Sequence, residues 1–319
     1  MNPFSNLLLR PEALHIPDGF LSLPVSILLW AAMLALVGLA IRRIDRSAIE
    51  RATPLMGIMA AFIFAGQMIN FPIAGGTSGH LLGGVLAAIT LGPWAGILVM
   101  TTVISVQALV FQDGGLLALG ANVFNMGILT VAVGAGAQAL TRGRSARTRL
   151  AAAGVAAWVS VLAGAVATAL QLWLSGTAAL GLVMPVMVGV HVVIGLGEAL
   201  ITIAALTFIR GSRPDLLENE AVSPARGWIV PGLAVTAAVL LLAPFASAFP
   251  DGLERVAEDL GFIAAAQGAP YGILPDYTIP ALGETGLSTI AAGLAGIVMI
   301  LLMFYLARRA RRSRTGTGT

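Results

Sequence analysis

The chain contains no lysine and no cysteine, and charged residues make up only 10% of its 319 residues. Without cysteine it forms neither disulfide bridges nor thiolate metal sites. Without lysine it has neither a Schiff-base residue nor the lysine of a phosphate-binding P-loop. The sequence therefore excludes ATP hydrolysis by such a loop, whatever source of energy the protein uses.

Hydrophobic residues, by contrast, make up 58% of the chain, and the mean hydropathy is +0.92. This value is far above what the surface of a water-soluble domain carries, so we predict an integral membrane protein. Uncharged apolar segments able to cross about 30 Å of hydrocarbon recur along the chain. The nine candidates are Pro24–Ile41, Pro54–Phe71, Gly79–Leu91, Pro93–Phe111, Leu116–Leu140, Leu150–Leu174, Ala179–Ile209, Trp228–Phe249 and Leu287–Leu306.

Arginine clusters between these segments predict the orientation in the membrane. They lie within residues 42–51, 142–149, 210–226 and 308–314, and the positive-inside rule makes all four cytoplasmic. Four crossings are then needed between the first two clusters, so the short segment Gly79–Leu91 counts as a crossing rather than a re-entrant piece. The N-terminus is predicted outside and the C-terminus inside, in the bacterial inner or cell membrane. A cleaved signal peptide fits poorly because the arginines follow the first apolar segment.

The polar stretch at residues 211–227 is the best linker in the sequence. It divides a seven-span module, residues 14–210, from a two-span module, residues 228–319. Within the second module, residues 250–286 are acidic and are predicted to form an external loop. We therefore expect an all-α integral membrane protein with a seven-helix bundle and a two-helix C-terminal module.

Polar residues inside the apolar segments are candidates for function. Two of the three histidines, His15 and His80, are predicted on the outer side, and His191 lies within a span. Glu198 follows His191 by seven residues, about two helical turns, so both side chains share one helix face. An intramembrane carboxylate normally faces the bundle interior. For both residues, an interhelical hydrogen bond or packing role is favoured over direct contact with a substrate.

His80 ends the stretch "AGGTSGH", which begins at Ala74 and joins two apolar segments. The glycines allow this loop to bend tightly and to approach a ligand closely. A small-residue loop at membrane depth is tolerated where it is buried in protein or lines a cavity. Two imidazoles on one side of the membrane, His15 and His80, suit a borderline divalent metal.

Four sequence blocks carry a resemblance to a known family. They are "LHIPDGFLS", "NFPIAGGTSGHLLGG", "FQDGGLLALGANVFNMG" and "GLGEALIT", between Leu14 and about Ile209. In order and spacing they resemble the CbiM/NikM family, the substrate-capture (S) subunits of energy-coupling-factor transporters for cobalt and nickel. The later stretch "FPDGLERVAEDLGF" resembles the PDGLE segment of the small companion subunit, NikN.

The resemblance implies a metal site near the outer surface that uses nitrogen ligands only. In the family the ligands are the amine of the initiator methionine, the backbone nitrogen and imidazole of the next histidine, and the imidazole of the glycine-rich loop. In this sequence the amine would come from the position of Leu14, the backbone nitrogen and one imidazole from His15, and the other imidazole from His80. Nitrogen ligands in a planar array suit Ni²⁺ and Cu²⁺ and discriminate against Mg²⁺ and Ca²⁺, which prefer oxygen ligands. Residues that could support the site are Asp18, Asn70, Ser78, His191 and Glu198.

Leu14 departs from the family pattern, which has the initiator methionine at that position. One hypothesis, which we favour, is that translation starts at residue 14 from a leucine codon decoded as methionine, so that residues 1–13 are a misassigned extension. The alternative is a genuine extension that is removed by processing, or that leaves a weaker site built from His15, His80 and Asp18.

The resemblance further implies transport of Co²⁺ or Ni²⁺ as substrate, with no cofactor and no catalysis in this chain. Its partners would be a transmembrane (T) subunit and two cytoplasmic ATPases, with no nucleic acid.

Two rival functions remain open. An intramembrane metal-dependent hydrolase would use His80, His191 and Glu198, although no H-E-x-x-H helix is present. A proton-coupled secondary carrier would need several buried carboxylates, and Glu198 is the only one well inside a span.

Overall fold

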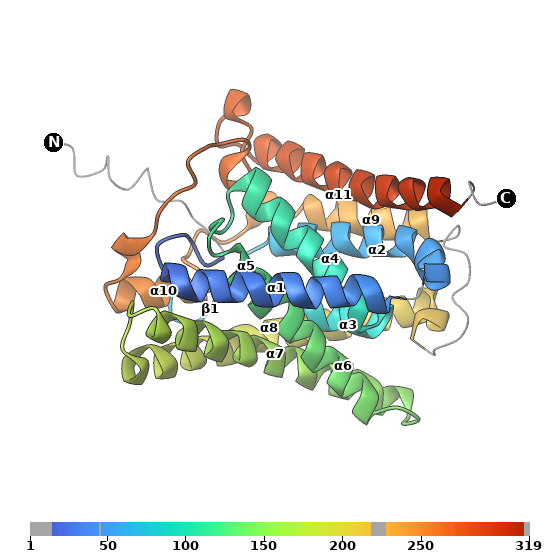
Figure 1. The fold of residues 1–319 in the computed structure, drawn as a ribbon, viewed down its shortest axis with the longest axis horizontal. Helices are drawn as coiled ribbons and strands as arrows, with labels where there is room; N and C mark the ends of the chain where they lie inside the picture. Colours follow the sequence, from blue (N-terminus) through green and yellow to red (C-terminus); the bar gives the residue numbers. More distant parts are fainter. Residues whose placement is uncertain (1–14, 45, 218–227, 316–319) are drawn as a thin grey trace.

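The computed structural model describes residues 15–44, 46–217 and 228–315 of the chain (Figure 1). Leu14 and the predicted extension at residues 1–13 lie outside this range, as do residues 218–227 of the predicted linker. The described residues are mostly helical, and six of their helices are long and apolar enough to cross a membrane. The predicted all-α integral membrane fold is confirmed.

In the described residues, the bundle consists of eight long helical stretches, two of which are made of more than one helical segment. Six are single helices: α1 (Leu23–Arg43), α2 (Arg46–Gln67), α7 (Ala146–Leu174), α8 (Leu180–Ser212), α9 (Ile229–Leu240) and α11 (Gly286–Thr315). Another consists of α4 (Pro93–Val106) and the π-helical turn Gln107–Phe111. The last runs through α5 (Leu119–Asn122), a π-helical stretch Val123–Leu129, and α6 (Thr130–Leu140).

Several helix boundaries differ from the sequence prediction, for example at α2 and α9. Helix α2 begins at Arg46 instead of Pro54, because a helix continues past the hydrocarbon layer into polar residues that an apolar window leaves out. The predicted span Trp228–Phe249 is an α-helix only to Leu240. It is followed by a short 3₁₀ turn, Ala243–Phe245, where Pro244 cannot continue the α-helical hydrogen bonds.

The predicted glycine-rich loop is a β-hairpin. Strand β1 (Phe71–Ile73) pairs antiparallel with β2 (Thr77–Gly79). The predicted third crossing is helical only in α3 (Gly84–Leu91), whose eight residues rise about 12 Å, too little to cross the hydrocarbon layer. The chain between β2 and α3, residues 80–83, is therefore non-helical, and it is buried or half-buried in the protein. Non-helical backbone of this kind is tolerated within a membrane protein where protein surrounds it.

The helices run side by side along the long axis of the molecule (Figure 1). The ends of α1 and α11, the start of α2 and the turn between α6 and α7, all arginine-rich, lie at one end. The hairpin and the short helix α10 (Gly252–Asp259) lie at the other. The helix formed by α4 and its π-helical turn is the most buried of the six long apolar helices. Within its most apolar stretch 67% is buried, against 22% for α1, which leaves most of its apolar side chains exposed or half-buried.

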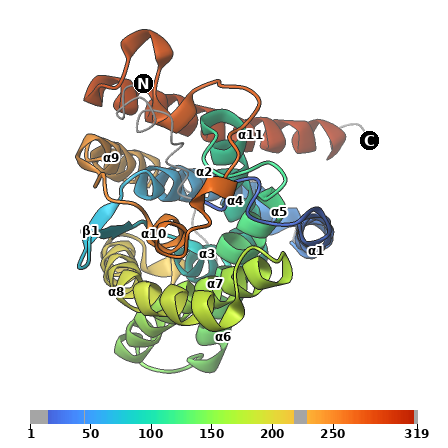
Figure 2. The ribbon, with the colours of Figure 1, turned by 90° about the vertical axis from the view of Figure 1, so that its left-hand side faces the viewer.

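The C-terminal part of the chain packs directly on the rest of the bundle. Helix α2 contacts both α9 and α11. Between those two helices, the segment that contains α10 crosses the hairpin end of the molecule, which faces the viewer in Figure 2. This segment also includes short 3₁₀ turns at Ile263–Ala265, Pro275–Tyr277 and Pro280–Leu282. The segment therefore covers the place where the candidate site lies.

Candidate metal centre

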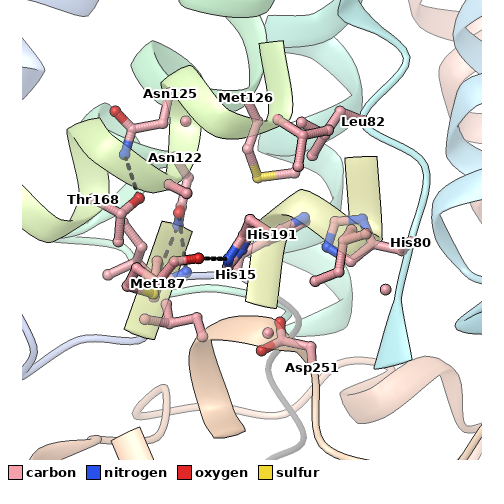
Figure 3. Close-up of a pocket in the computed structure, with 18 residues that line it drawn as sticks. His15, His80, Leu82, Asn122, Asn125, Met126, Thr168, Met187, His191 and Asp251 are labelled. Carbon is pink, nitrogen blue, oxygen red and sulfur yellow. Dashed lines mark hydrogen bonds between the residues drawn. The ribbon is translucent and has the colours of Figure 1, made fainter. Parts of the chain in front are cut away.

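All three histidines of the chain line one cavity at the hairpin end of the bundle. The cavity has a volume of about 90 Å³. His15 precedes α1, His80 directly follows β2, and His191 comes from α8. Figure 3 shows the three imidazoles and Asp251 around the same space. The structure thus brings together His15 and His80, as predicted, and adds His191.

The His15 side chain is almost completely buried, at 2% exposure. Its Nδ1 lies 3.1 Å from the backbone oxygen of Asp113 and 3.3 Å from the Asp113 carboxylate oxygen Oδ1. Its Nε2 is buried and has no hydrogen-bond partner among the described residues. A buried imidazole nitrogen without a partner is costly, so this atom has the environment of a ligand atom.

The backbone around His15 is held by two polar side chains. Asn122 accepts from the Ile16 N–H and donates to the Ile16 oxygen, both at 3.0 Å. Asp18 accepts from the N–H groups of Leu116 and Ala118, also at 3.0 Å. Asp18 does not line the cavity. The carboxylate of Asp18 thus anchors the histidine segment from outside the cavity.

The rings of His15 and His80 stand nearly perpendicular, with their centroids 5.6 Å apart. The Nδ1 of His80 lies 3.0 Å from the backbone oxygen of Leu81. Second hydrogen bonds of this kind orient metal-ligating histidines. These two rings bring two imidazole side chains, both candidate nitrogen ligands, into one cavity from distant parts of the chain.

His191 hydrogen-bonds through Nδ1 to the Met187 oxygen of its own helix, at 2.7 Å. Its ring packs against Gly252, where an added Cβ would lie 2.8 Å from the His191 Cε1. His191 therefore lines the cavity and contacts the C-terminal segment.

Glu198 does not line the cavity, although it is fully buried. Its carboxylate accepts from the N–H groups of Leu82 at 2.7 Å and Gly83 at 2.9 Å. These two groups lie in the non-helical chain that leads into α3, where no helical partner is available. Glu198 thus supplies the hydrogen bonds that this buried backbone would otherwise lack.

Asn70 and Ser78 connect the hairpin to the C-terminal segment, and neither lines the cavity. Ser78 donates from Oγ to the Phe249 oxygen at 2.8 Å and from its N–H to the Pro250 oxygen at 2.9 Å. The backbone oxygen of Asn70 accepts from the Ser247 N–H at 2.8 Å.

Two buried aspartates of the site are missing from the sequence prediction. Asp113 lies against His15, and its Oδ2 accepts from the Tyr277 hydroxyl at 2.6 Å. Asp251 lines the cavity and caps α10 by accepting from the Glu254 N–H at 2.7 Å. Burial raises the pKa of the Asp251 carboxyl from 3.8 to about 8. Both residues stand in sequence blocks singled out above, but nothing in the sequence places either one beside a histidine.

The remaining wall includes Asn125 and Met126, from the π-helical stretch after α5. Such stretches are rare and often occur at functional sites. Asn125 exchanges hydrogen bonds with Gln171 of α7, at 2.8 and 2.7 Å. Among the residues that the structure describes, no three His, Asp or Glu side chains form a group that could hold a metal ion.

Comparison with known proteins identifies two parts of the chain. Residues 15–216 match the CbiM family, described as a cobalt uptake substrate-specific transmembrane region. Residues 226–313 match the PDGLE domain. A protein of Archaeoglobus fulgidus, provisionally named fused nickel transport protein NikMN, is 41% identical over 93% of this chain and 99% of its own length. The fused nickel transport protein NikMN of Rhodobacter capsulatus is 32% identical over 84% of this chain and 83% of its own length.

Solved structures agree with this result. A crystal structure of a transition metal transporter superimposes with a TM-score of 0.55 and 33% identity, over 64% of this chain and 96% of its own. A truncated transition metal transporter gives a TM-score of 0.54 and 34% identity, over 62% of this chain and 99% of its own. The chain therefore belongs to the CbiM family of cobalt and nickel transport proteins, and it carries a PDGLE domain at its C-terminal end.

Proposed function

We propose that this chain captures Co²⁺ or Ni²⁺ at the outer face of the membrane, as the substrate-binding subunit of an energy-coupling-factor importer. The observation that carries the proposal is the pair His15 and His80, whose rings share a cavity, with the Nε2 of His15 buried and unpartnered among the described residues. Imidazole nitrogens suit both ions, which are neighbours in the Irving–Williams order.

Two imidazoles leave a planar site incomplete. The further ligands in this proposal are the backbone nitrogen of His15 and the amine of residue 14, if translation starts there. An uncleaved extension would join residue 14 to an ordinary peptide bond and remove the amine from the ligand set. Metal affinity would then fall to that of a site built on the two rings.

The orientation follows from the two ends of the bundle. The arginine-rich end is cytoplasmic in this proposal, and the histidine cavity opens toward the outside. The ion would be released inward when a transmembrane partner subunit and two cytoplasmic ATPases turn over, because the chain has no P-loop of its own.

The chain has two modules in this proposal, residues 14–210 and 228–319, and the second one controls access to the metal. Three contacts support this role. Pro250 accepts from the hairpin, Gly252 packs on His191, and Tyr277 donates to Asp113 beside His15. An ion entering the cavity from outside would have to pass this segment.

The test is a Ni²⁺ and Co²⁺ titration of the purified chain after its intact mass and N-terminal sequence have been determined. His80→Ala removes one of the few available nitrogen ligands, so we expect a loss of affinity of at least about a hundredfold, more than the roughly 10- to 100-fold that losing an outer-shell partner causes. His191→Ala is the matched control, because His191 lines the same cavity. Its effect should be within about tenfold, since it acts at most through ligand orientation.

Equal losses in both variants would contradict the capture site and favour a three-histidine site, as a hydrolase would need. The structure argues against Glu198 as the general base of such an enzyme. Its carboxylate is engaged by two backbone N–H groups and does not line the cavity.

A further inference from the structure

A second cavity lies at the arginine-rich end of the molecule, between the end of α6, the start of α7 and the end of α8. Its volume is about 110 Å³. It shares no lining residue with the histidine cavity. Capture of a metal ion at the opposite end therefore gives this cavity no role.

The cavity has an apolar floor and a cationic rim. The floor consists of aliphatic side chains from four helices, namely Ile89, Ala137, Leu150, Ala153 and Leu206. Three arginines line the cavity: Arg142 in the turn after α6, Arg149 in the first turns of α7, and Arg210 near the end of α8. No aspartate or glutamate is among the described lining residues.

The three guanidinium groups have little compensation within the described part of the chain. Arg149 donates from Nη1 to the Leu217 backbone oxygen at 2.8 Å, which orients its side chain. None of the ion pairs between described residues involves Arg142, Arg149 or Arg210. The positive end of the α7 dipole lies at the same place, because Ala146, the first residue of α7, also lines the cavity. An anion would relieve the repulsion between these charges.

The positive-inside rule explains why arginines lie at this end, but it does not require them to converge. Arg144 in the same turn and Arg147 in the first turn of α7 are exposed, as Arg142 and Arg210 are, but they do not line the cavity. Arg142 and Arg149, only a few residues away, do line the cavity. The convergence of three arginines from three elements is therefore a feature beyond membrane orientation.

We propose that this cavity binds the phosphate head group of an anionic phospholipid. The planar guanidinium group matches phosphate oxygens in pairs. Basic pockets between transmembrane helices bind such head groups. The apolar floor favours a lipid over free phosphate, and Leu140, next to the lining residue Thr141, is 84% exposed, so the rim continues into a surface suited to acyl chains.

The test compares two double variants of the full-length chain in detergent. Arg149→Gln with Arg210→Gln removes two rim charges, and Arg144→Gln with Arg147→Gln removes the same charge from the same end without touching the cavity. Binding of phosphatidylglycerol, phosphatidylcholine and inorganic phosphate is measured by native mass spectrometry and by the shift in thermal unfolding. We expect phosphatidylglycerol binding to weaken at least about tenfold in the first variant and less than about twofold in the second.

Several results would overturn the proposal. Equal weakening in both double variants would show a diffuse charge effect, and equal binding of phosphatidylcholine would show that the charges are irrelevant. If inorganic phosphate alone reproduced the shift, the ligand would be a soluble anion. If phosphatidylglycerol failed but a glutamate-rich peptide bound, the cavity would receive an acidic segment of a partner protein. Should the first double variant fail to fold, Arg142→Gln is compared with Arg144→Gln, since each removes one charge from the same turn and only Arg142 lines the cavity.

Discussion

At the residue scale, the candidate metal centre depends on a chain of contacts that starts outside the CbiM region. The Tyr277 hydroxyl of the PDGLE domain donates to Asp113, and Asp113 lies against His15. Burial and the nearby Asp113 carboxylate raise the pKa of Tyr277, so its hydroxyl stays protonated and remains a donor. The Tyr277 ring also stacks on Phe111, at a centroid distance of 4.7 Å. A residue of one module therefore helps to set the environment of a metal-ligand candidate in the other.

Replacing Tyr277 with phenylalanine should lower the stability of the folded chain while keeping the stacked ring. A hydrogen bond to a charged group contributes about 1.5 to 3 kcal/mol, and its loss leaves the buried Asp113 carboxylate short of a donor. The measurement is unfolding by denaturant in detergent. Tyr271→Phe is the control, because Tyr271 donates to the Leu109 oxygen at the surface. A Tyr277→Phe variant no less stable than the control would show that the bond to Asp113 is weak.

At the element scale, the least regular part of the fold lies beside the site. The hairpin, the non-helical chain at residues 80–83 and the short helix α3 stand where the sequence predicts a loop and one continuous crossing segment. Gly83 has a φ of +82°, a conformation that glycine adopts without strain. This arrangement lets the chain present His80 to the cavity and then continue into α3. Its cost is buried backbone without helical hydrogen bonds, which Glu198 offsets.

Glu198→Ala should therefore be strongly destabilising. Two buried N–H groups, of Leu82 and Gly83, would lose their acceptor, at about 1 to 3 kcal/mol each. Glu198→Gln keeps one acceptor oxygen and should be intermediate. Thr202→Ala, about one turn further along the same buried face of α8, is the control, because its hydroxyl has no hydrogen-bond partner among the described residues. A Glu198→Ala variant that is as stable as the unmodified chain would contradict this structural role.

At the scale of the whole molecule, the two ends of the bundle differ in chemistry. One end gathers histidines and buried carboxylates, and the other gathers arginines around an apolar cavity. The PDGLE domain spans both, since α9 and α11 run beside α2 while the segment between them crosses the histidine end (Figure 2). The proposed orientation puts the histidine end outside.

The absence of cysteine makes this orientation directly testable. Single cysteines are introduced at Glu284, in the exposed segment before α11, and at Ser145, in the exposed turn before α7. A maleimide that cannot cross membranes should label Glu284→Cys in intact cells and label Ser145→Cys only after lysis. The unmodified chain is the blank. The reverse pattern would invert the topology and place the histidine cavity inside.

The sequence by itself determined the membrane class, most of the apolar helices and the family, and it singled out two of the histidines that line the cavity, His15 and His80. These follow from composition, from apolar length and from contiguous blocks, all of which are local properties of the chain. Only the tertiary structure decided that His191 joins them, that Asp113 and Asp251 belong to the site, and that Glu198 supports α3 instead of lining the cavity. Which residues line or support the cavity depends on which distant helices become neighbours. Neither the type of a residue nor its spacing along one helix predicts this.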